Sequence, residues 1–150
     1  KTYHITGWKV GYILAPRELM AEFRKVHQFN VFTVNTPVQL ALADYMADAS
    51  RHLALAAFYQ GKRDFFRAAM AGSRFELLPA RGTYFQLARY GAISDLGDAA
   101  FCAHLTRNVG VAAIPVSAFF ADGRDERVIR FCFAKNEATL AAACERLCKV

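Results

Sequence analysis

Residues 1–12 read KTYHITGWKVGY and place one lysine on either side of a turn that Gly7 punctuates. The sequence then continues through WKVGYILAP (8–16), an apolar run that is rich in strand-forming residues and closes at Pro16. Continuous apolar runs of this length are typical of strands that are buried on both faces. We therefore expect an interior strand over residues 8–16, with Lys1 and Lys9 flanking the turn that leads into it.

The two lysines suggest a specific chemistry. A lysine amine is a useful nucleophile only when its pKa, ordinarily about 10.4, is lowered, and burial near a second cation lowers it. The second ammonium then requires an anion of its own, for which a phosphate is suitable. A Schiff-base lysine with a phosphate-binding cation nearby is what pyridoxal phosphate requires. The spacing of Lys1 and Lys9 alone also fits two solvated lysines, so the rest of the chain must decide.

Composition narrows the possible classes of function. The length of 150 residues suits an ordinary folded domain with a real core. No apolar run approaches the roughly 18–20 residues that span a bilayer, so we expect no membrane partner. The net charge of +6 comes from scattered basic residues without a run of five like charges, and we expect no nucleic-acid partner.

The cysteines and the first residue carry further expectations. The cysteines lie in apolar periodic segments without a CxxC motif, which predicts buried reduced thiols in a cytoplasmic protein and no metal site; they are Cys102, Cys132, Cys144 and Cys148. The chain begins with neither an initiator Met nor the apolar core of a secretory signal. We therefore expect a fragment of a longer parent chain.

Hydrophobic periodicity predicts three helices in the first half of the chain, over residues 17–29, 37–49 and 51–72. We expect Thr36 to cap the second helix, with Pro37 at its first position, and Ser50 to cap the third. The length of the third helix suggests a connector between two bodies, with a domain boundary near residues 60–65.

After Gly72 the pattern changes to short strands and amphipathic helices. We expect a hairpin of strands 75–79 and 82–88, further strands over 111–116 and 127–135, and helices over 98–110 and 137–150. The sequence therefore predicts an α+β layer with a mostly antiparallel sheet.

Arg130 is a candidate binding residue within VIRFCFAK (128–135). Arginine offers a planar fork that binds a carboxylate through two hydrogen bonds, which lysine cannot copy. In a strand, its side chain points to the face opposite Ile129 and Phe131. A strand arginine on its own is also consistent with a surface charge.

Several segments together resemble the class I/II family of fold-type I aminotransferases. KTYHITGWKVGY resembles the active-site segment of that family, and four further motifs follow in the family's order: VHQFNVFTVNTPVQLALADYM, GTYFQLA, GVAAIPVSAFF and IRFCFAKNEATL. The resemblance covers essentially the whole chain and is strongest to the methionine and kynurenine/glutamine aminotransferases. It implies an α/β fold in which residues 1–62 complete the large domain and begin the connecting helix, and residues 63–150 form the small domain.

The resemblance also implies roles for particular residues. Lys1 matches the Schiff-base lysine, Lys9 the cation that contacts the cofactor phosphate, and Arg130 the clamp for the substrate α-carboxylate. Phe32 matches an aromatic that crosses the dimer interface to the neighbour's substrate pocket, although by itself it fits a packing role. Tyr84 and Phe85 fit either a substrate contact or core packing.

The function implied by the resemblance is transamination between a neutral amino acid such as methionine and a 2-oxo acid, with pyridoxal 5'-phosphate as cofactor. The parent would be a homodimer, and this chain by itself would be inactive. Two alternatives stay open: a carbon–sulfur β-lyase that uses the same lysine, and an aminotransferase-like sensor domain of a transcription regulator.

Overall fold

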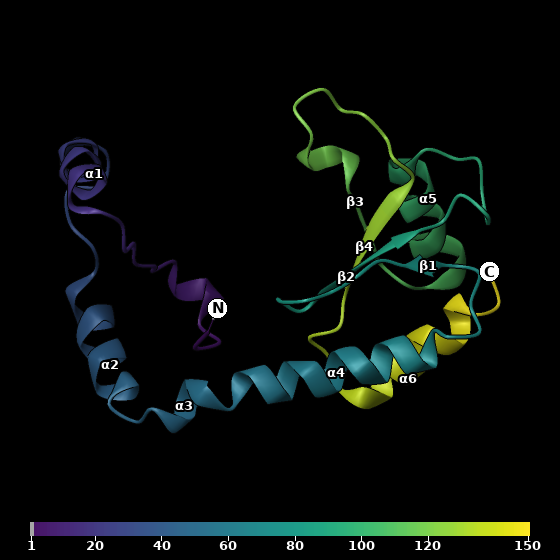
Figure 1. The fold of residues 1–150 in the computed structure, drawn as a ribbon, viewed down its shortest axis with the longest axis horizontal. Coiled ribbons are helices and arrows are strands. Elements are labelled where there is room, and N and C mark those ends of the chain that lie inside the picture. Colours follow the sequence, from purple (N-terminus) through teal and green to yellow (C-terminus); the bar gives the residue numbers. More distant parts are fainter. Residues whose placement is uncertain (1) are drawn as a thin grey trace. The chain divides into compact units, whose positions relative to one another are not determined.

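The computed structural model describes residues 2–150, so the predicted Schiff-base position, Lys1, lies outside the described residues. The chain consists of two compact units, one that runs to Leu55 and one from Ala56 to Val150 (Figure 1). The change from one unit to the other falls in the first turn of α4 (Leu55–Ala69).

The first unit is helical. It contains a 3₁₀ helix at Thr6–Trp8, followed by α1 (Arg17–Asn30), α2 (Thr36–Met46) and α3 (Ser50–Leu53). The helices predicted from residue 17 and from residue 37 are therefore confirmed.

The predicted caps of this unit are wrong in detail. Asn35, rather than Thr36, caps α2, because its side-chain oxygen accepts a hydrogen bond from the backbone N–H of Val38 at 3.2 Å. The helix predicted over 51–72 is interrupted at Ala54, whose N–H donates to the carbonyl of His52 instead of one four residues back. Ser50 does not cap a long helix, and its N–H donates to Asp48.

The strand expected over residues 8–16 is not formed. Trp8 ends the 3₁₀ helix, and residues 9–16 carry no strand. A strand exists only through hydrogen bonds to a neighbouring strand, and none of the described residues pairs with this run. Composition alone could not reveal that requirement.

The first unit also has no core of its own among residues 2–55, none of which is fully buried. Large apolar side chains are open to solvent, including Leu14 at 87% and Phe29 at 86% of their surface. Monomeric proteins rarely expose apolar surface so extensively, which marks these faces as surfaces for further polypeptide.

The second unit begins with α4 and then forms the hairpin of β1 (Glu76–Leu77) and β2 (Phe85–Arg89). It continues through α5 (Asp98–His104), β3 (Ile114–Pro115), β4 (Val128–Cys132) and α6 (Glu137–Leu147). After α5 the helix widens into a π-helical turn, Leu105–Val109, which ends at Gly110 in the left-handed conformation, φ 74°. The predicted order of strands and helices is confirmed.

Within residues 2–150 the strands form one four-stranded antiparallel sheet in the order β1-β2-β4-β3. Strand β4 lies between β2 and β3, and Arg130 is opposite Leu87 on one side and Ile114 on the other. Figure 1 shows α4 and α6 side by side, and the thiol of Cys148 lies 3.5 Å from the carbonyl oxygen of Ala69.

One face of this sheet packs into the core. Ile129, Phe131 and Phe133 are almost fully buried there, together with aromatic side chains of the surrounding elements such as Phe66 and Phe101. Alternation along β4 consequently turns Arg130 to the other face. The prediction that Arg130 lies opposite Ile129 and Phe131 is confirmed by the burial pattern of this strand.

Candidate functional site

Arg130 contacts two aromatic rings on the face of the sheet away from the core. Its guanidinium carbon is 4.1 Å from the centre of the Phe85 ring and 4.9 Å from that of Phe119. Phe85 is on the neighbouring strand β2, whereas Phe119 ends a 3₁₀ helix, Ser117–Phe119, that follows β3. Cations over aromatic faces at such distances are attracted by the ring quadrupole.

The guanidinium group of Arg130 also has unused hydrogen-bonding capacity. Its Nε atom is buried and has no hydrogen-bond partner among residues 2–150, and none of the described carboxylates forms an ion pair with it. A buried donor without a partner is costly, so native structures rarely leave one in place without a reason. The arrangement fits a fork that is kept free for an anionic ligand.

Lys9 occupies a turn that holds its backbone in the left-handed conformation, with φ 54°. It ends the 3₁₀ helix Thr6–Trp8, and its N–H donates to the carbonyl of Thr6 at 3.3 Å. The side chain is exposed, and within residues 2–150 no carboxylate neutralises it. Its ammonium group is therefore available to an anion.

Phe32 is likewise held in the left-handed region, φ 66°, one residue beyond the C-cap of α1, Val31. Its N–H donates to the carbonyl of His27 at 2.9 Å, which closes the end of the helix. Glycine is the usual residue at such a position, because a side chain there is strained by about 1–2 kcal/mol. The ring is 78% exposed, so packing within this unit does not offset the strain.

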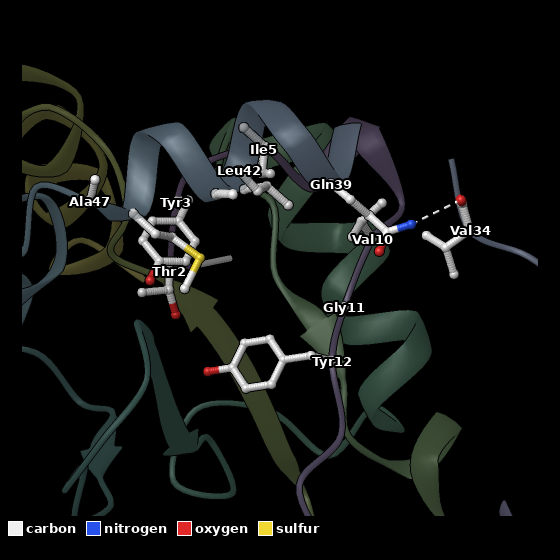
Figure 2. A pocket seen from close by; sticks show the side chains of 12 residues that line it. Thr2, Tyr3, Ile5, Val10, Gly11, Tyr12, Val34, Gln39, Leu42 and Ala47 are labelled. Atoms are coloured by element: carbon white, nitrogen blue, oxygen red, sulfur yellow. Dashed lines mark hydrogen bonds between the residues drawn. The ribbon is translucent and has the colours of Figure 1, made fainter. Parts of the chain in front are cut away.

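A cavity of about 790 Å³ lies between the N-terminal segment and α2 in the first unit (Figure 2). Its walls are mostly apolar, and the side chain of Gln39 closes one end by donating to the carbonyl of Val34 at 3.0 Å. Lys9 and Phe32 do not line it, although Val10, which follows Lys9, and Val34, two residues after Phe32, do. The structure therefore does not bring the described site residues of this unit together in the cavity.

The predicted site residues are divided between the two units. Lys9 and Phe32 belong to the first unit and Arg130 to the second. The ring of Phe85 contacts the guanidinium group of Arg130, and a contact between Phe85 and a substrate stays a prediction. Phe119 was missed: it stands within the motif GVAAIPVSAFF, but no periodicity in the sequence connects it to β4.

The cysteines and potential metal ligands add no second site. Cys102 and Cys144 are buried as predicted, and burial raises the pKa of each thiol to about 11, so neither is a nucleophile at neutral pH. Cys132 and Cys148 are exposed in this chain, contrary to the prediction that all four would be buried. Among residues 2–150 no cluster of three acidic, His or Cys side chains could hold a metal ion, and no helix is long and apolar enough to cross a membrane.

Comparison with known proteins assigns the chain to a protein family. The family model for aminotransferase class I and II matches residues 1–147. The methionine aminotransferase of Escherichia coli K12 is 57% identical over 148 residues, which cover 98% of this chain and 38% of that protein. Human kynurenine–oxoglutarate transaminase 1 is 32% identical over 171 residues, which cover 99% of this chain and 40% of that protein.

Solved structures agree with the sequence comparisons. YbdL from Escherichia coli, whose structure and reactivity identify a methionine aminotransferase function, matches with a TM-score of 0.91 and 56% identity over 100% of this chain and 40% of its own. The N-succinyldiaminopimelate aminotransferase of Mycobacterium tuberculosis matches with a TM-score of 0.83 and 36% identity, over 99% of this chain and 39% of its own. These neighbours confirm the predicted α/β fold of the fold-type I transferases.

The matched part is limited in length, because the chain spans about 40% of the relatives that it matches. Within that span the family model covers residues 1–147, which include the partly buried Arg130 on β4. The chain belongs to the class I and II aminotransferase family.

Proposed function

We propose that this chain is the C-terminal part of a pyridoxal-phosphate-dependent aminotransferase that transfers the amino group of a neutral amino acid, such as methionine, to a 2-oxo acid. The observation that carries the proposal is the free fork of Arg130, whose buried Nε has no partner among the described residues and whose guanidinium group contacts the rings of Phe85 and Phe119. The 57% identity to a methionine aminotransferase supports this substrate class.

Arg130 would hold the substrate through its α-carboxylate. A guanidinium group binds a carboxylate through two parallel N–H···O bonds, which fixes both the position and the orientation of the amino acid. The rings of Phe85 and Phe119 beside the fork would lower the local polarity and so strengthen the attraction between the charges. They also make the surroundings of the fork apolar, which favours a neutral side chain over a second carboxylate.

Lys9 and Lys1 would hold the cofactor. The ammonium group of Lys9, which no carboxylate among residues 2–150 neutralises, fits a phosphate. Lys1 would carry the cofactor through its Nζ atom, and its amine, once released, would take the proton from the substrate Cα as general base. Bound pyridoxal phosphate would supply the electron sink that makes this proton removable.

Phe32 would contribute to the substrate pocket of a second subunit in a homodimer. Its exposed ring and strained backbone are what a residue with a role outside its own unit would show, because the strain needs a compensating interaction elsewhere. The exposed apolar faces of the first unit likewise require further polypeptide to cover them.

The proposed activity can be tested on the complete protein that carries this chain. Methionine and a 2-oxo acid acceptor are supplied with pyridoxal phosphate, and the keto acid of methionine is measured by chromatography. We expect transfer from methionine to exceed transfer from aspartate. Absence of the keto acid would contradict the proposed transamination. Release of pyruvate and ammonia from cystathionine at a higher rate than transfer from methionine would make β-elimination the main activity.

A further inference from the structure

The aromatic cover of Arg130 depends on a short segment outside the sheet. Phe85 is held by the ladder of β2, but Phe119 lies at the end of a 3₁₀ helix of three residues, Ser117–Phe119. Such a short helix has little stability of its own. The position of the Phe119 ring over Arg130 therefore depends on what anchors this helix.

Asp98 supplies the anchor from the first turn of α5. Its side chain is almost fully buried, with 3% of the residue exposed. One carboxylate oxygen accepts from the backbone N–H of Ser117 and the other from its hydroxyl group, both at 2.7 Å. Among the described residues no Lys or Arg forms an ion pair with Asp98. Its buried charge is thus stabilised by directional hydrogen bonds, which fix Ser117 in orientation as well as in place.

A second carboxylate fixes Asp98 itself. The backbone N–H of Asp98 donates to Asp125 at 2.7 Å, and the other oxygen of Asp125 accepts from the N–H of Arg127, which directly precedes β4. The start of α5, the 3₁₀ helix and the start of β4 are therefore joined by hydrogen bonds around one buried residue. Arg130 and Phe119 lie on two of the elements so joined.

We propose that Asp98 and Ser117 are positioning residues, which set the Phe119 ring against Arg130 and thereby orient its fork for the carboxylate of the substrate. The inference rests on the proposed function, because it assumes that Arg130 binds that carboxylate. If the anchor is weakened, the ring leaves one face of the guanidinium group, water enters and the fork gains rotational freedom. Ligands with a carboxylate lose affinity, and ligands without one do not.

The test compares four variants of the complete protein. Ser117→Ala removes the hydroxyl donor but keeps the backbone bond, and Phe119→Leu removes the ring but keeps an apolar side chain. Ser117→Thr changes the side chain but keeps a hydroxyl group. Phe120→Leu is the matched control, because the ring of Phe120, next to Phe119 in the chain, contacts a different guanidinium group, that of the exposed Arg124 at 3.8 Å.

Two measurements are made on each variant. The first is the KM for methionine and for methioninamide, which has no carboxylate. We expect Ser117→Ala and Phe119→Leu to raise the KM for methionine about 3- to 10-fold, with a smaller change in kcat. The KM for methioninamide should stay within about twofold of the wild-type value. Ser117→Thr and Phe120→Leu should stay within about twofold of the wild type for both substrates.

The second measurement needs no turnover. Binding of methylthiopropanoate, which has the carboxylate but no amine to react, is measured by calorimetry, and the same variants should weaken it by the same factors. If the wild type fails to transaminate methionine, the proposed function is wrong, and this binding series still tests the anchor. Unchanged affinity for methylthiopropanoate in Ser117→Ala and Phe119→Leu, or an equal loss for methioninamide, would overturn the inference.

Discussion

Arg130 is the residue at which local geometry and chemistry agree most closely. Its position on β4 follows from the alternation of buried neighbours, and its guanidinium group is covered by two rings but neutralised by none of the described carboxylates. A point charge in its place would keep the attraction and lose the second hydrogen bond together with the planar stacking.

Arg130→Lys should therefore lower kcat/KM for methionine by about 100-fold, which corresponds to roughly 3 kcal/mol. Steady-state kinetics of the complete protein measure the effect. Arg89→Lys is the control, because Arg89 is half exposed on the neighbouring strand and forms an ion pair with Glu76 at 2.9 Å. Such surface pairs contribute about 0–1 kcal/mol, so this variant should change kcat/KM by less than about threefold. Equal losses in both variants would contradict a carboxylate role for Arg130.

Phe32 leads to a prediction about substrate choice. If its ring forms an apolar wall of the partner's pocket, Phe32→Ala should lower kcat/KM for methionine about 10-fold more than for alanine, whose side chain does not reach a distant wall. Phe29→Ala is the control, since Phe29 is similarly exposed but lies within α1. If Phe32→Ala leaves the ratio of kcat/KM for methionine to kcat/KM for alanine unchanged, Phe32 has only a packing role.

Sequence reasoning at this scale succeeded where a residue's surroundings are local. The face of Arg130 was predictable, because Ile129 and Phe131 are its immediate neighbours in the chain. The contact with Phe119 was not, because it depends on how the segment after β3 returns to the sheet and on the buried carboxylate of Asp98. No spacing rule links residues that only such a loop brings together.

At the scale of elements, the start of α6 allows a direct test of the contribution that an N-cap side chain makes to stability. Asn136 is its N-cap, and the side-chain oxygen accepts from the N–H of Thr139 at 2.8 Å. Asn136→Ala should lower the free energy of unfolding by about 1 kcal/mol, because the N–H of Thr139 loses its hydrogen-bond partner. Asn136→Asp should keep most of the stabilisation, because its carboxylate can accept the same hydrogen bond. Urea unfolding of the complete protein measures both changes. A loss in the aspartate variant as large as in the alanine variant would show that capping is not the cause.

The elements also show where periodicity is insufficient. Helices α1, α2 and α6 follow their apolar spacing, because a helix satisfies its backbone hydrogen bonds internally. The apolar run over residues 8–16 does not form a strand, since a strand needs a partner and none of the described residues provides one. The long helix expected after Ser50 is divided at Ala54 by a hydrogen bond that composition does not indicate.

For the whole molecule, the core of the second unit predicts a loss of stability at alkaline pH. Burial, with the nearby charges of Asp125 and Asp98, raises the pKa of Tyr90 to about 12, and burial raises the pKa of Cys102 and of Cys144 to about 11. The folded state therefore keeps these protons at a pH where the unfolded state releases them. Stability is complete below about pH 9 and falls as the pH rises towards 11 and 12.

The pH dependence can be measured as the urea midpoint of the complete protein between about pH 8 and pH 11. Tyr90→Phe removes one of the three titrating groups, so the midpoint of this variant should fall less steeply above about pH 10, whatever the variant loses at neutral pH. A parallel curve for the variant and the wild type would contradict the contribution of Tyr90.

Features of the complete protein were the hardest to obtain from this chain. The family was predictable, because its motifs are continuous stretches of sequence, and the comparisons confirm it. The division into domains at residues 62 and 63, the homodimer and the cytoplasmic location stay predictions. They depend on polypeptide and contacts outside the described residues, and the chain spans about 40% of its relatives.

The central claim is that the amine of Lys1 carries the cofactor while Lys9 binds its phosphate, and one labelling measurement tests it most directly. The complete protein is incubated with pyridoxal phosphate, reduced with borohydride and digested, and the modified peptide is identified by mass spectrometry. The account predicts a label on Lys1 that disappears in Lys1→Ala and remains, with weaker cofactor binding, in Lys9→Ala. A label on a different lysine of the wild type would contradict this assignment. An undiminished amount of label in Lys1→Ala would contradict it as well.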